Sequence, residues 1–451
     1  MEEKPSELLG ISSSSSSLLH KLIISLSNPI QQTLANTPYI PPESSTISIK
    51  STLLDLLPKP NSPKDTDALR IKVRDFSLCC AALASAEDGS SPVISWVPRN
   101  LSVSAKSAFS ELSQAVFCDL DGDFSRRIVD IDVDLRFAPN ECKLAVGLMP
   151  DVLPLLKGVI KESAVDPAED EFYAASARVP VVSAVLAAFQ FRWLVTQVGY
   201  PYLGKLCGLV IPCGLTALDH WSPEVKGQAM IVFIHLARNV NAAELGWYED
   251  AILDACCQNI ASSDELWHHL VEMSVLMITC MQRRNPRSSW FERMLGEMLS
   301  HLERQPKNKE RRNSWLHLIE PVFNAMGLVL LAHFRRIFPL FFGWMHVDDD
   351  KTVVLVLQRV YTIMKLTWVR NTPYVERLVD ELTILYKESA VRKGREDIRT
   401  HIRQIFVLLQ QCKGQQLEAA WNKHRDDPNL IALMPSSIKT DIVSHWLEQL
   451  C

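Results

Sequence analysis

The chain has 451 residues, of which 47% are hydrophobic and 22% charged, a composition that can bury a sizeable core. Glycine is scarce at 16 residues, which favours a helical protein over a turn-rich β protein. The formal net charge of −5 excludes the strongly basic field that attracts nucleic acid or an acidic membrane, so neither is expected as a partner.

Eleven cysteines are scattered along the chain without any C-x-x-C motif. This odd, unpaired set indicates neither a disulfide framework nor a zinc site, and we predict reduced, buried thiols. The start, Met-Glu-Glu-Lys-Pro, lacks the basic-then-apolar order of a secretory signal. It predicts a cytoplasmic or nuclear protein.

The two most apolar stretches lie around residues 181–218 and 321–347. Charged residues interrupt both stretches, namely Arg192 and Lys205 in the first and Arg335 and Arg336 in the second. A membrane-spanning helix needs about 20 predominantly apolar residues. We therefore expect no transmembrane helix.

Residues 1–64 contain a six-serine run, Ser12 to Ser17, and several prolines. This composition predicts a poorly ordered N-terminal segment with one or two short helices. Residues 65–179 predict an irregular helical region, with helices near 66–86, 105–118 and 144–160. Acidic, polar segments at 119–139 and 163–178 separate them.

The first acidic segment contains Asp119, Asp121 and Asp123, a spacing that resembles the start of a calcium loop. Gly122, however, stands earlier than the glycine of an EF-hand loop, and Arg126 brings a positive charge into it. A solvated loop is the preferred interpretation.

The repeat pattern is clearest from Leu218 to Ile234. Asp219 and Ser222 suit the capping of a helix start, and Pro223 suits the first helical position because its missing N–H has no partner there. Apolar residues then form one stripe, at Val225, Ala229, Val232, Phe233 and Leu236. A helix is therefore predicted over 223–239.

Similar polar breaks recur at intervals of about 43 residues, near positions 176, 219, 262, 305, 348 and 391. That interval lies within the range of about 40–47 residues found in HEAT and armadillo repeats. The sequence thus predicts an all-α, superhelical solenoid, with residues 180–451 as its repeat region. The further predicted helices are 180–198, 202–218, 243–259, 264–283, 288–304, 313–331, 335–346, 351–368, 373–387, 396–412, 414–424 and 437–450.

Tryptophans fall roughly once per predicted helix, at Trp221, Trp247, Trp267, Trp290, Trp315, Trp344 and Trp368. A core stripe explains this regularity. The alternative for one or two of them is an exposed anchor for a partner, because tryptophan is enriched among interface hot spots. Basic clusters at 283–287 and 304–312 lie on predicted turns, and we interpret them as solvated.

No catalytic or cofactor motif occurs: the sequence lacks a phosphate-binding loop, a dinucleotide fingerprint, a nucleophile elbow and H-E-x-x-H. His268 and His269 are adjacent on a predicted helix, so they point in different directions and cannot chelate one metal ion. Asp348 to Asp350 stand at an expected helix N-terminus, where carboxylates interact favourably with the helix dipole. We predict no enzyme activity, no metal and no cofactor.

The stretch from Asp219 to Leu382 resembles the Tel-two-interacting protein two family, a subunit of the Triple-T cochaperone complex. Val369 stands where the family has proline between tryptophan and arginine, and residues 1–180 show no match. The residues that carry the resemblance are Asp219, Trp221, Lys226, Gly227, Leu236, Glu244, Leu245, Trp247, Ile252, Leu328 to His333, Arg336, Pro339, Leu340, Thr352, Leu357, Leu366, Thr367, Trp368 and Arg370.

The resemblance implies a non-catalytic HEAT-type scaffold that docks onto a larger helical-repeat protein of the Triple-T complex. Such an assembly supports chaperone-dependent maturation and stability of phosphatidylinositol kinase-related kinases, and thereby DNA-damage signalling. The alternative is a generic HEAT-repeat adaptor, such as a transport receptor or a phosphatase scaffold. An enzyme hidden in the region 119–166 is a third hypothesis.

The end of a solenoid needs a polar cap or a partner. The last predicted helix places Ile442, Trp446 and Leu450 on one stripe, and Leu433 and Met434 lie in the preceding loop. We predict these five as partner-binding residues. In the alternative, they pack on the helix at 396–412 and close the core.

Overall fold

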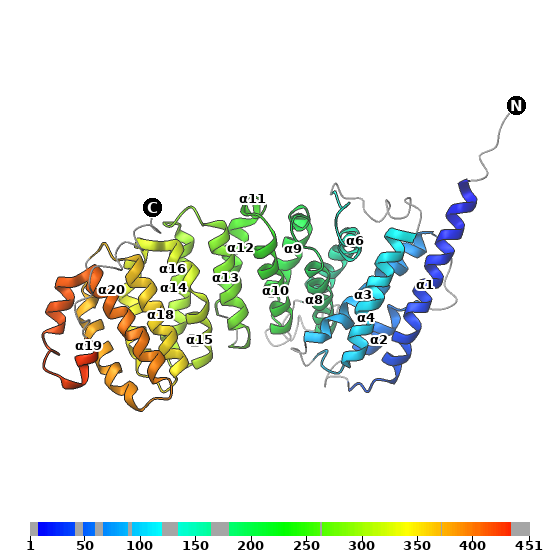
Figure 1. Cartoon of the computed structure of the whole chain (residues 1–451). Coiled ribbons are helices and arrows are strands. Elements are labelled where there is room, and N and C mark those ends of the chain that lie inside the picture. Colours follow the sequence, from blue (N-terminus) through cyan, green and yellow to red (C-terminus); the bar gives the residue numbers. More distant parts are fainter. Residues whose placement is uncertain are drawn as a thin grey trace, which may run out of the picture. The chain divides into compact units, whose positions relative to one another are not determined.

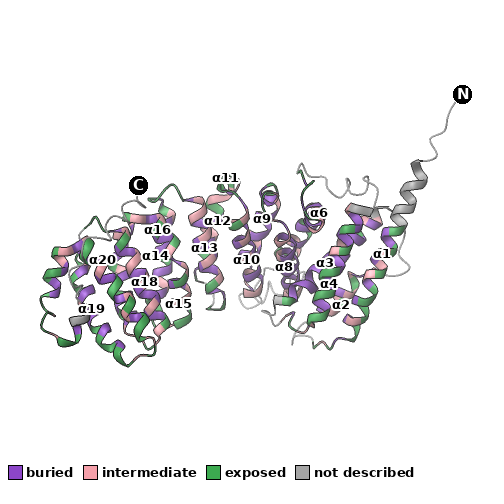
Figure 2. Ribbon diagram, viewed as in Figure 1, coloured by how far each residue is buried: buried purple, intermediate pink, exposed green. Residues whose placement is uncertain are grey.

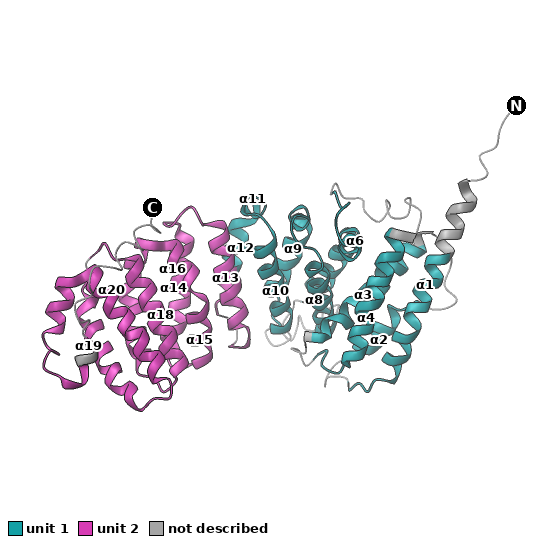
Figure 3. Cartoon of the chain, in the orientation of Figure 1, with its two compact units in different colours: residues 1–255 teal, residues 256–451 magenta. Residues whose placement is uncertain are grey.

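The computed structural model describes residues 8–40, 48–58, 66–88, 93–119, 134–163, 180–261, 264–370 and 372–433. Across these residues every regular element is a helix, and helices close in sequence pack on one another (Figure 1). The prediction of an all-α solenoid is confirmed. The chain divides into two compact units, residues 1–255 and 256–451 (Figure 3).

The elements of unit 1 are α1 (Leu8–Asn36), α2 (Ile49–Asp55), α3 (Thr66–Ala84), η1 (Ser85–Asp88), α4 (Arg99–Gln114), η2 (Ala115–Asp119), α6 (Asn140–Glu162), α8 (Val181–Thr196), η3 (Leu203–Leu206), α9 (Cys207–Leu218), α10 (Pro223–Asn239), α11 (Ala242–Leu245) and η4 (Gly246–Tyr248). Helix α12 (Glu249–Asn259) contains the boundary between the units.

Helix α8 is the first helix of the predicted repeat region 180–451, and it packs on helices from both sides of that predicted boundary. The helix is buried almost all round from Ala184 to Val195. It packs against α3 and α6, which precede it in the sequence, and against α10, which follows it. Burial on every face joins the irregular N-terminal region to the first repeats in one core.

The N-terminal segment contains a long helix that its sequence did not predict. Instead of one or two short helices, it holds the 29-residue α1 and the shorter α2. Leu19, Ile23, Ile30 and Leu34 are buried along α1, which packs against α3 and α4. Burial of these four side chains thus favours the helix despite its internal Pro29. The expectation of a poorly ordered segment does not hold for α1 and α2.

The elements of unit 2 are η5 (Asp264–Leu266), α13 (Trp267–Met281), α14 (Ser289–Arg304), α15 (Lys309–Leu318), α16 (Glu320–Met326), η6 (Gly327–His333), α17 (Phe334–Met345), α18 (Asp350–Leu366), α19 (Tyr374–Glu388), η7 (Ser389–Val391), α20 (Arg395–Trp421) and η8 (Pro428–Leu433). Buried residues lie on the helix faces that meet within the unit, and exposed residues lie on the outer faces (Figure 2).

Hydrogen bonds between successive repeats show the period of unit 2 directly. The indole of Trp267 bonds to a backbone carbonyl 44 residues later. The Gly394 amide donates to Asp350, 44 residues earlier, and the Lys413 ammonium donates to a carbonyl 45 residues earlier. These separations agree with the predicted interval of about 43 residues.

The helices begin at the predicted breaks, but the two residues predicted to cap α10 do not cap it. Helix α10 begins at Pro223 and ends at Asn239, as predicted. The hydroxyl of Ser222 donates to the Glu224 carboxylate at 2.6 Å and caps no backbone amide. Asp219 lies at the C-terminal end of α9, so it cannot cap α10. Helix α18 begins at Asp350, which confirms a helix N-terminus at the acidic triplet.

One stretch, Glu320–Met345, is long and apolar enough by length and composition to cross a membrane, contrary to the expectation of no such candidate. Its backbone is interrupted: Gly327 adopts a positive φ of 53°, which favours glycine, and η6 separates α16 from α17. The same turn also divides the single helix predicted over 313–331. Half of its most apolar window is buried, and Phe338 and Phe341 lie in the core.

Candidate interaction surfaces

The described residues contain no group of three His, Cys, Asp or Glu side chains that could hold a metal ion. The rings of His268 and His269 have centroids 5.8 Å apart and planes inclined by 73°, so they diverge. The segment with Asp121 and Asp123 lies outside the described residues.

Asp349 of the acidic triplet joins two repeats. Its Oδ2 accepts hydrogen bonds from Thr352 Oγ1 at 2.5 Å and Asn313 Nδ2 at 3.3 Å, and its Oδ1 lies 3.2 Å from the Lys309 ammonium. Burial raises the pKa of Asp349, but these hydrogen bonds and the Lys309 charge outweigh it and lower the pKa to about 2. The carboxylate is therefore ionised, and it links the start of α18 to α15.

The cysteine thiols of the described residues are mostly buried, and all are free. Burial raises the pKa of Cys79, Cys213 and Cys256 to about 12. A thiol that stays protonated is a poor nucleophile and metal ligand. This agrees with the predicted reduced, buried thiols.

His220 holds the turn between α9 and α10 and is fully buried. Its Nδ1 accepts a hydrogen bond from the Ser222 N–H at 3.0 Å, and its Nε2 lies 3.1 Å from Ser163 Oγ. Ser163 Oγ in turn donates to the Ile160 carbonyl at 3.1 Å. This network assigns the proton to Nε2, and burial lowers the pKa of His220, which keeps the ring neutral. The sequence analysis gave His220 no role, because its partner Ser163 lies 57 residues away.

Four of the family-motif residues, Asp219, Trp221, Lys226 and Gly227, lie at or close to this turn. Trp221 is half-buried, stacks on His220 with ring centroids 5.7 Å apart, and donates from Nε1 to the Ser163 carbonyl at 3.3 Å. Burial lowers the pKa of Lys226, and the charge of the exposed Asp219 partly offsets it. Gly227 is buried within α10. These positions are structural.

Three exposed aromatic side chains, Phe137, Tyr200 and Trp247, lie on the segments before α6, η3 and α12 of unit 1. They are 89%, 66% and 90% exposed, respectively. In Figure 1, the coil before α6 and the short α11 lie at the same upper end of the unit's helices. We call these three residues the aromatic edge.

Two of the turns that carry the aromatic edge contact each other. Helix α11, just before Trp247, packs against η3, just after Tyr200. A Cβ at Gly208 in α9 would also lie 3.6 Å from the Tyr248 hydroxyl. The turns that carry Tyr200 and Trp247 therefore lie close together.

Trp247 follows α11, a one-turn helix with a complete capping box. The side chain of Asn241 caps the helix, and the Glu244 carboxylate accepts from the Asn241 N–H at 3.2 Å. A Cβ at Gly204 would meet this carboxylate, so the glycine permits α11 to approach η3. A capped helical turn, anchored by the buried Leu245, thus presents the Trp247 ring to solvent.

Trp368 and Arg370 lie on an exposed turn after α18, where Trp368 is 55% exposed. The buried Lys413 donates to the carbonyl oxygens of both residues, at 2.8 Å for Trp368. Burial lowers the pKa of Lys413, and its non-helical φ of −137° marks a kink in α20. A buried ammonium thus fixes the turn that exposes Trp368.

The seven tryptophans therefore divide into three groups. Trp267, Trp315 and Trp344 are buried, as the core-stripe interpretation predicts, whereas Trp247 and Trp368 are exposed. Trp221 and Trp290 are half-buried. The basic clusters divide as well. Residues Arg283, Arg284 and Arg287 are exposed, but Arg311 and Arg312 are buried in α15, so a solvated interpretation is wrong for these two.

Four of the predicted partner-binding residues, Met434, Ile442, Trp446 and Leu450, lie outside the described residues. Leu433 is buried at the end of η8, which packs against α19. Its role in partner binding stays a prediction.

A cavity of about 590 Å³ lies among α4, α6 and α8, and Pro139 and Gln197 at its rim adjoin the aromatic edge in sequence. Its charged groups are internally paired: Lys106 forms an ion pair with Glu87, and Ser110 donates to Glu141 at 2.5 Å. An ion pair and a short hydrogen bond of this kind link neighbouring helices across the cavity wall.

No model of a known protein family matches the chain. The chain is 51% identical over 420 residues to an Arabidopsis thaliana protein named "Uncharacterized protein At2g39910", with 92% of this chain and 94% of that protein covered. It is 25% identical over 196 residues to TELO2-interacting protein 2 of Homo sapiens, covering 40% of this chain and 38% of that protein. The Rattus norvegicus protein of the same name is 24% identical over 250 residues, covering 51% and 48%. The chain thus spans less than half the length of these two proteins.

Solved structures of helical-repeat transport receptors are also similar. A crystal structure of importin beta in a polyethylene glycol condition matches with a TM-score of 0.44 and 10% identity, covering 89% of this chain and 49% of that chain. A Kap121p mutant matches with a TM-score of 0.43 and 12% identity, covering 96% and 50%.

Proposed function

Because the chain belongs to the same family as the Arabidopsis thaliana protein At2g39910 and is distantly homologous to TELO2-interacting protein 2, we propose that it is a non-catalytic scaffold subunit of a Triple-T-type cochaperone complex. The homology to TELO2-interacting protein 2 carries this proposal, since the name of that relative states an interaction with TELO2. The partner would be a larger helical-repeat protein. Through it the chain would support chaperone-dependent stability of phosphatidylinositol kinase-related kinases in the cytoplasm or nucleus.

Exposed tryptophans support a binding role. Trp247 and Trp368 both lie in the segment that resembles the family, and both are exposed on turns whose backbone is held by internal contacts. A large aromatic ring that is already ordered loses little conformational entropy on binding, which is why tryptophan is common in interface hot spots. Within unit 1, the aromatic edge adds Phe137 and Tyr200 to such a surface.

The proposal is tested by affinity purification of the tagged chain from its own cells. We expect a larger helical-repeat protein in stoichiometric amount, together with a chaperone or a giant kinase. Depletion of the chain should lower the steady-state amount of those kinases without lowering their messenger RNA. Recovery of import factors or phosphatase subunits instead would assign the chain to the generic adaptor class.

Point variants test whether the exposed tryptophans bind the partner that is recovered by affinity purification. Trp247→Ala and Trp368→Ala are made separately, because the residues belong to different units. A hot-spot tryptophan contributes about 2 kcal/mol or more, so the variant that touches the partner should recover about thirtyfold less of it. Val391→Ala, at a position that is 93% exposed and outside the family motif, is the matched control and should recover the wild-type amount.

A further inference from the structure

Two consecutive arginines of α15 are equally buried and differently partnered. Arg311 and Arg312 are each only 5% exposed. The Arg311 guanidinium pairs with the Asp264 carboxylate and lies 4.7 Å from the centroid of the Trp267 ring. Arg312 has one hydrogen bond among the described residues, from Nη1 to the Pro306 carbonyl at 3.4 Å, and its Nε is buried without a partner.

Arg312 has no carboxylate within ion-pair distance in the part of the chain that the structure describes. The nearby Asp349 is already bonded to Thr352, Asn313 and Lys309. Burial lowers the pKa of Arg312, and the charge of Asp349 only partly offsets this effect. Arginine nevertheless stays protonated in proteins, so a positive charge is buried here without its own counterion.

Arg312 lines a cavity of about 450 Å³ between the start of α15 and α17. The cavity also contains the exposed Lys307 and the buried Trp344, whose Nε1 has no hydrogen-bond partner among the described residues. Pro339 and Leu340 supply apolar walls. At Gly343 a Cβ would meet no atom within 4 Å, so this side of the cavity is open. A cavity of this size is large enough for a side chain and its neighbours.

We propose that this cavity, the Arg312 pocket, binds a glutamate or aspartate side chain of a partner protein, flanked by an apolar residue of the same segment. The guanidinium, the ammonium and the indole N–H are all hydrogen-bond donors, which fits a carboxylate acceptor. The apolar walls of Pro339 and Leu340 fit an apolar neighbour of that carboxylate in a protein segment, which a free phosphate lacks. The inference rests on the proposed scaffold role, because the ligand belongs to a bound protein, but the pocket is testable without that partner.

The test uses the full-length chain labelled with ¹⁵N-arginine and titrated with the peptide acetyl-Leu-Glu-Leu-amide at millimolar concentration. We expect the Arg312 Nε resonance, assigned from its absence in Arg312→Met, to shift with the glutamate peptide. Acetyl-Leu-Gln-Leu-amide and inorganic phosphate should leave it in place. No shift with the glutamate peptide would overturn the proposal. An equal shift with phosphate would replace the partner carboxylate with a free anion and overturn it as well.

Two variants and one control separate binding from folding. Gly343→Leu fills the open side without altering a charge and should weaken peptide binding about tenfold or more, because it blocks the carboxylate from the guanidinium. Arg312→Met should keep or raise the Tm of the free chain, because it removes a buried charge that lacks a counterion. The matched control, Arg311→Met, should lower the Tm, because it removes the guanidinium that covers the Trp267 ring and pairs with Asp264.

Contrary results are equally specific. Equal loss of Tm in Arg312→Met and Arg311→Met would make Arg312 a structural residue and overturn the pocket. Wild-type peptide binding by Gly343→Leu would do the same. Neither result affects the recovery of a helical-repeat partner by affinity purification, so the pocket and the proposed function fail separately.

Discussion

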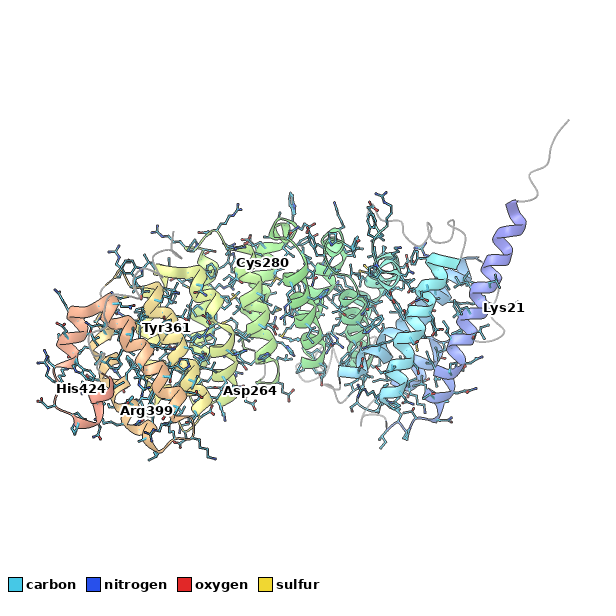
Figure 4. All side chains as sticks on the ribbon, in the orientation of Figure 1. Lys21, Asp264, Cys280, Tyr361, Arg399 and His424 are labelled. Atoms are coloured by element: carbon cyan, nitrogen blue, oxygen red, sulfur yellow. The ribbon has the colours of Figure 1, made fainter. Side chains whose placement is uncertain are left out.

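The indole Nε1 of Trp267 donates a hydrogen bond to the carbonyl oxygen of Arg311, 3.0 Å away and 44 residues later in the chain. The Arg311 guanidinium covers the same indole ring and pairs with Asp264, which lies at one end of the helices of unit 2 in Figure 4. A hydrogen bond to the backbone, a cation–π contact and an ion pair therefore join two successive repeats around the buried Trp267 ring. Such contacts between neighbouring repeats stabilise a solenoid, since each repeat packs only on its neighbours.

Trp267→Phe should lower the free energy of unfolding more than the same change at Trp344. Both rings are buried, so the loss of ring volume is similar, but only the Trp267 Nε1 has a hydrogen-bond acceptor among the described residues. The lost hydrogen bond should cost about 1–2 kcal/mol in addition. Urea denaturation of the two variants measures the difference, and equal losses would assign no stability to the hydrogen bond.

Stability should fall as the pH drops below about 6.5, the ordinary pKa of histidine. Burial lowers the pKa of His220, so in acid the unfolded chain binds a proton that the folded chain does not. Protonation would also break the hydrogen bond from the Ser222 N–H to Nδ1. His235, His301 and His333 have pKa values lowered by burial too, so they add to the same slope.

The variant His220→Gln should have a lower Tm at neutral pH and a shallower loss of Tm on acidification. Differential scanning calorimetry between about pH 7.5 and about pH 5.5 measures both quantities. His317→Gln, at an exposed position, is the control and should keep the wild-type slope. If the His220 variant loses Tm on acidification as steeply as the wild type, the pH dependence comes from the other three histidines and not from His220.

Lys413→Met should loosen the turn that carries Trp368. The variant keeps most of the aliphatic side chain but removes the ammonium that donates to the carbonyls of Trp368 and Arg370. Hydrogen bonds from a charged group are worth about 1.5–3 kcal/mol each. Amide hydrogen exchange in residues 367–370 should therefore accelerate about tenfold or more. Lys393→Met, at an exposed position, should leave exchange there unchanged. Unchanged exchange in both variants would mean that other contacts hold the turn.

Asp349→Asn should destabilise the chain at neutral pH and much less in acid. The folded pKa of about 2 lies below the ordinary 3.8, so the stabilisation is fully present above about pH 4 and is lost as the pH falls toward about 2. We expect a loss of roughly 1–2 kcal/mol at neutral pH in urea denaturation. Asp348→Asn, at an exposed neighbour, should cost little. A loss that persists unchanged near pH 2 would indicate a packing effect.

The sequence by itself determined the fold class, the repeat interval and many helix boundaries. A helix start is specified within a few residues, by a polar break, a proline and the apolar stripe that follows. For this reason α10 matches its predicted range and α18 begins at the acidic triplet. The interval between repeats was likewise accessible, because polar breaks recur along the chain at nearly constant spacing.

Only the tertiary structure decided which side chains face solvent and which polar groups meet. Trp267 and Trp247 have the same chemistry and similar positions before a helix, yet one is buried and the other exposed. Arg311 and Arg312 are neighbours in sequence, and only the first meets a carboxylate. The order of α1 likewise comes from burial against α3 and α4. In each case the deciding free energy comes from groups distant in sequence, through desolvation and pairing that local patterns do not contain.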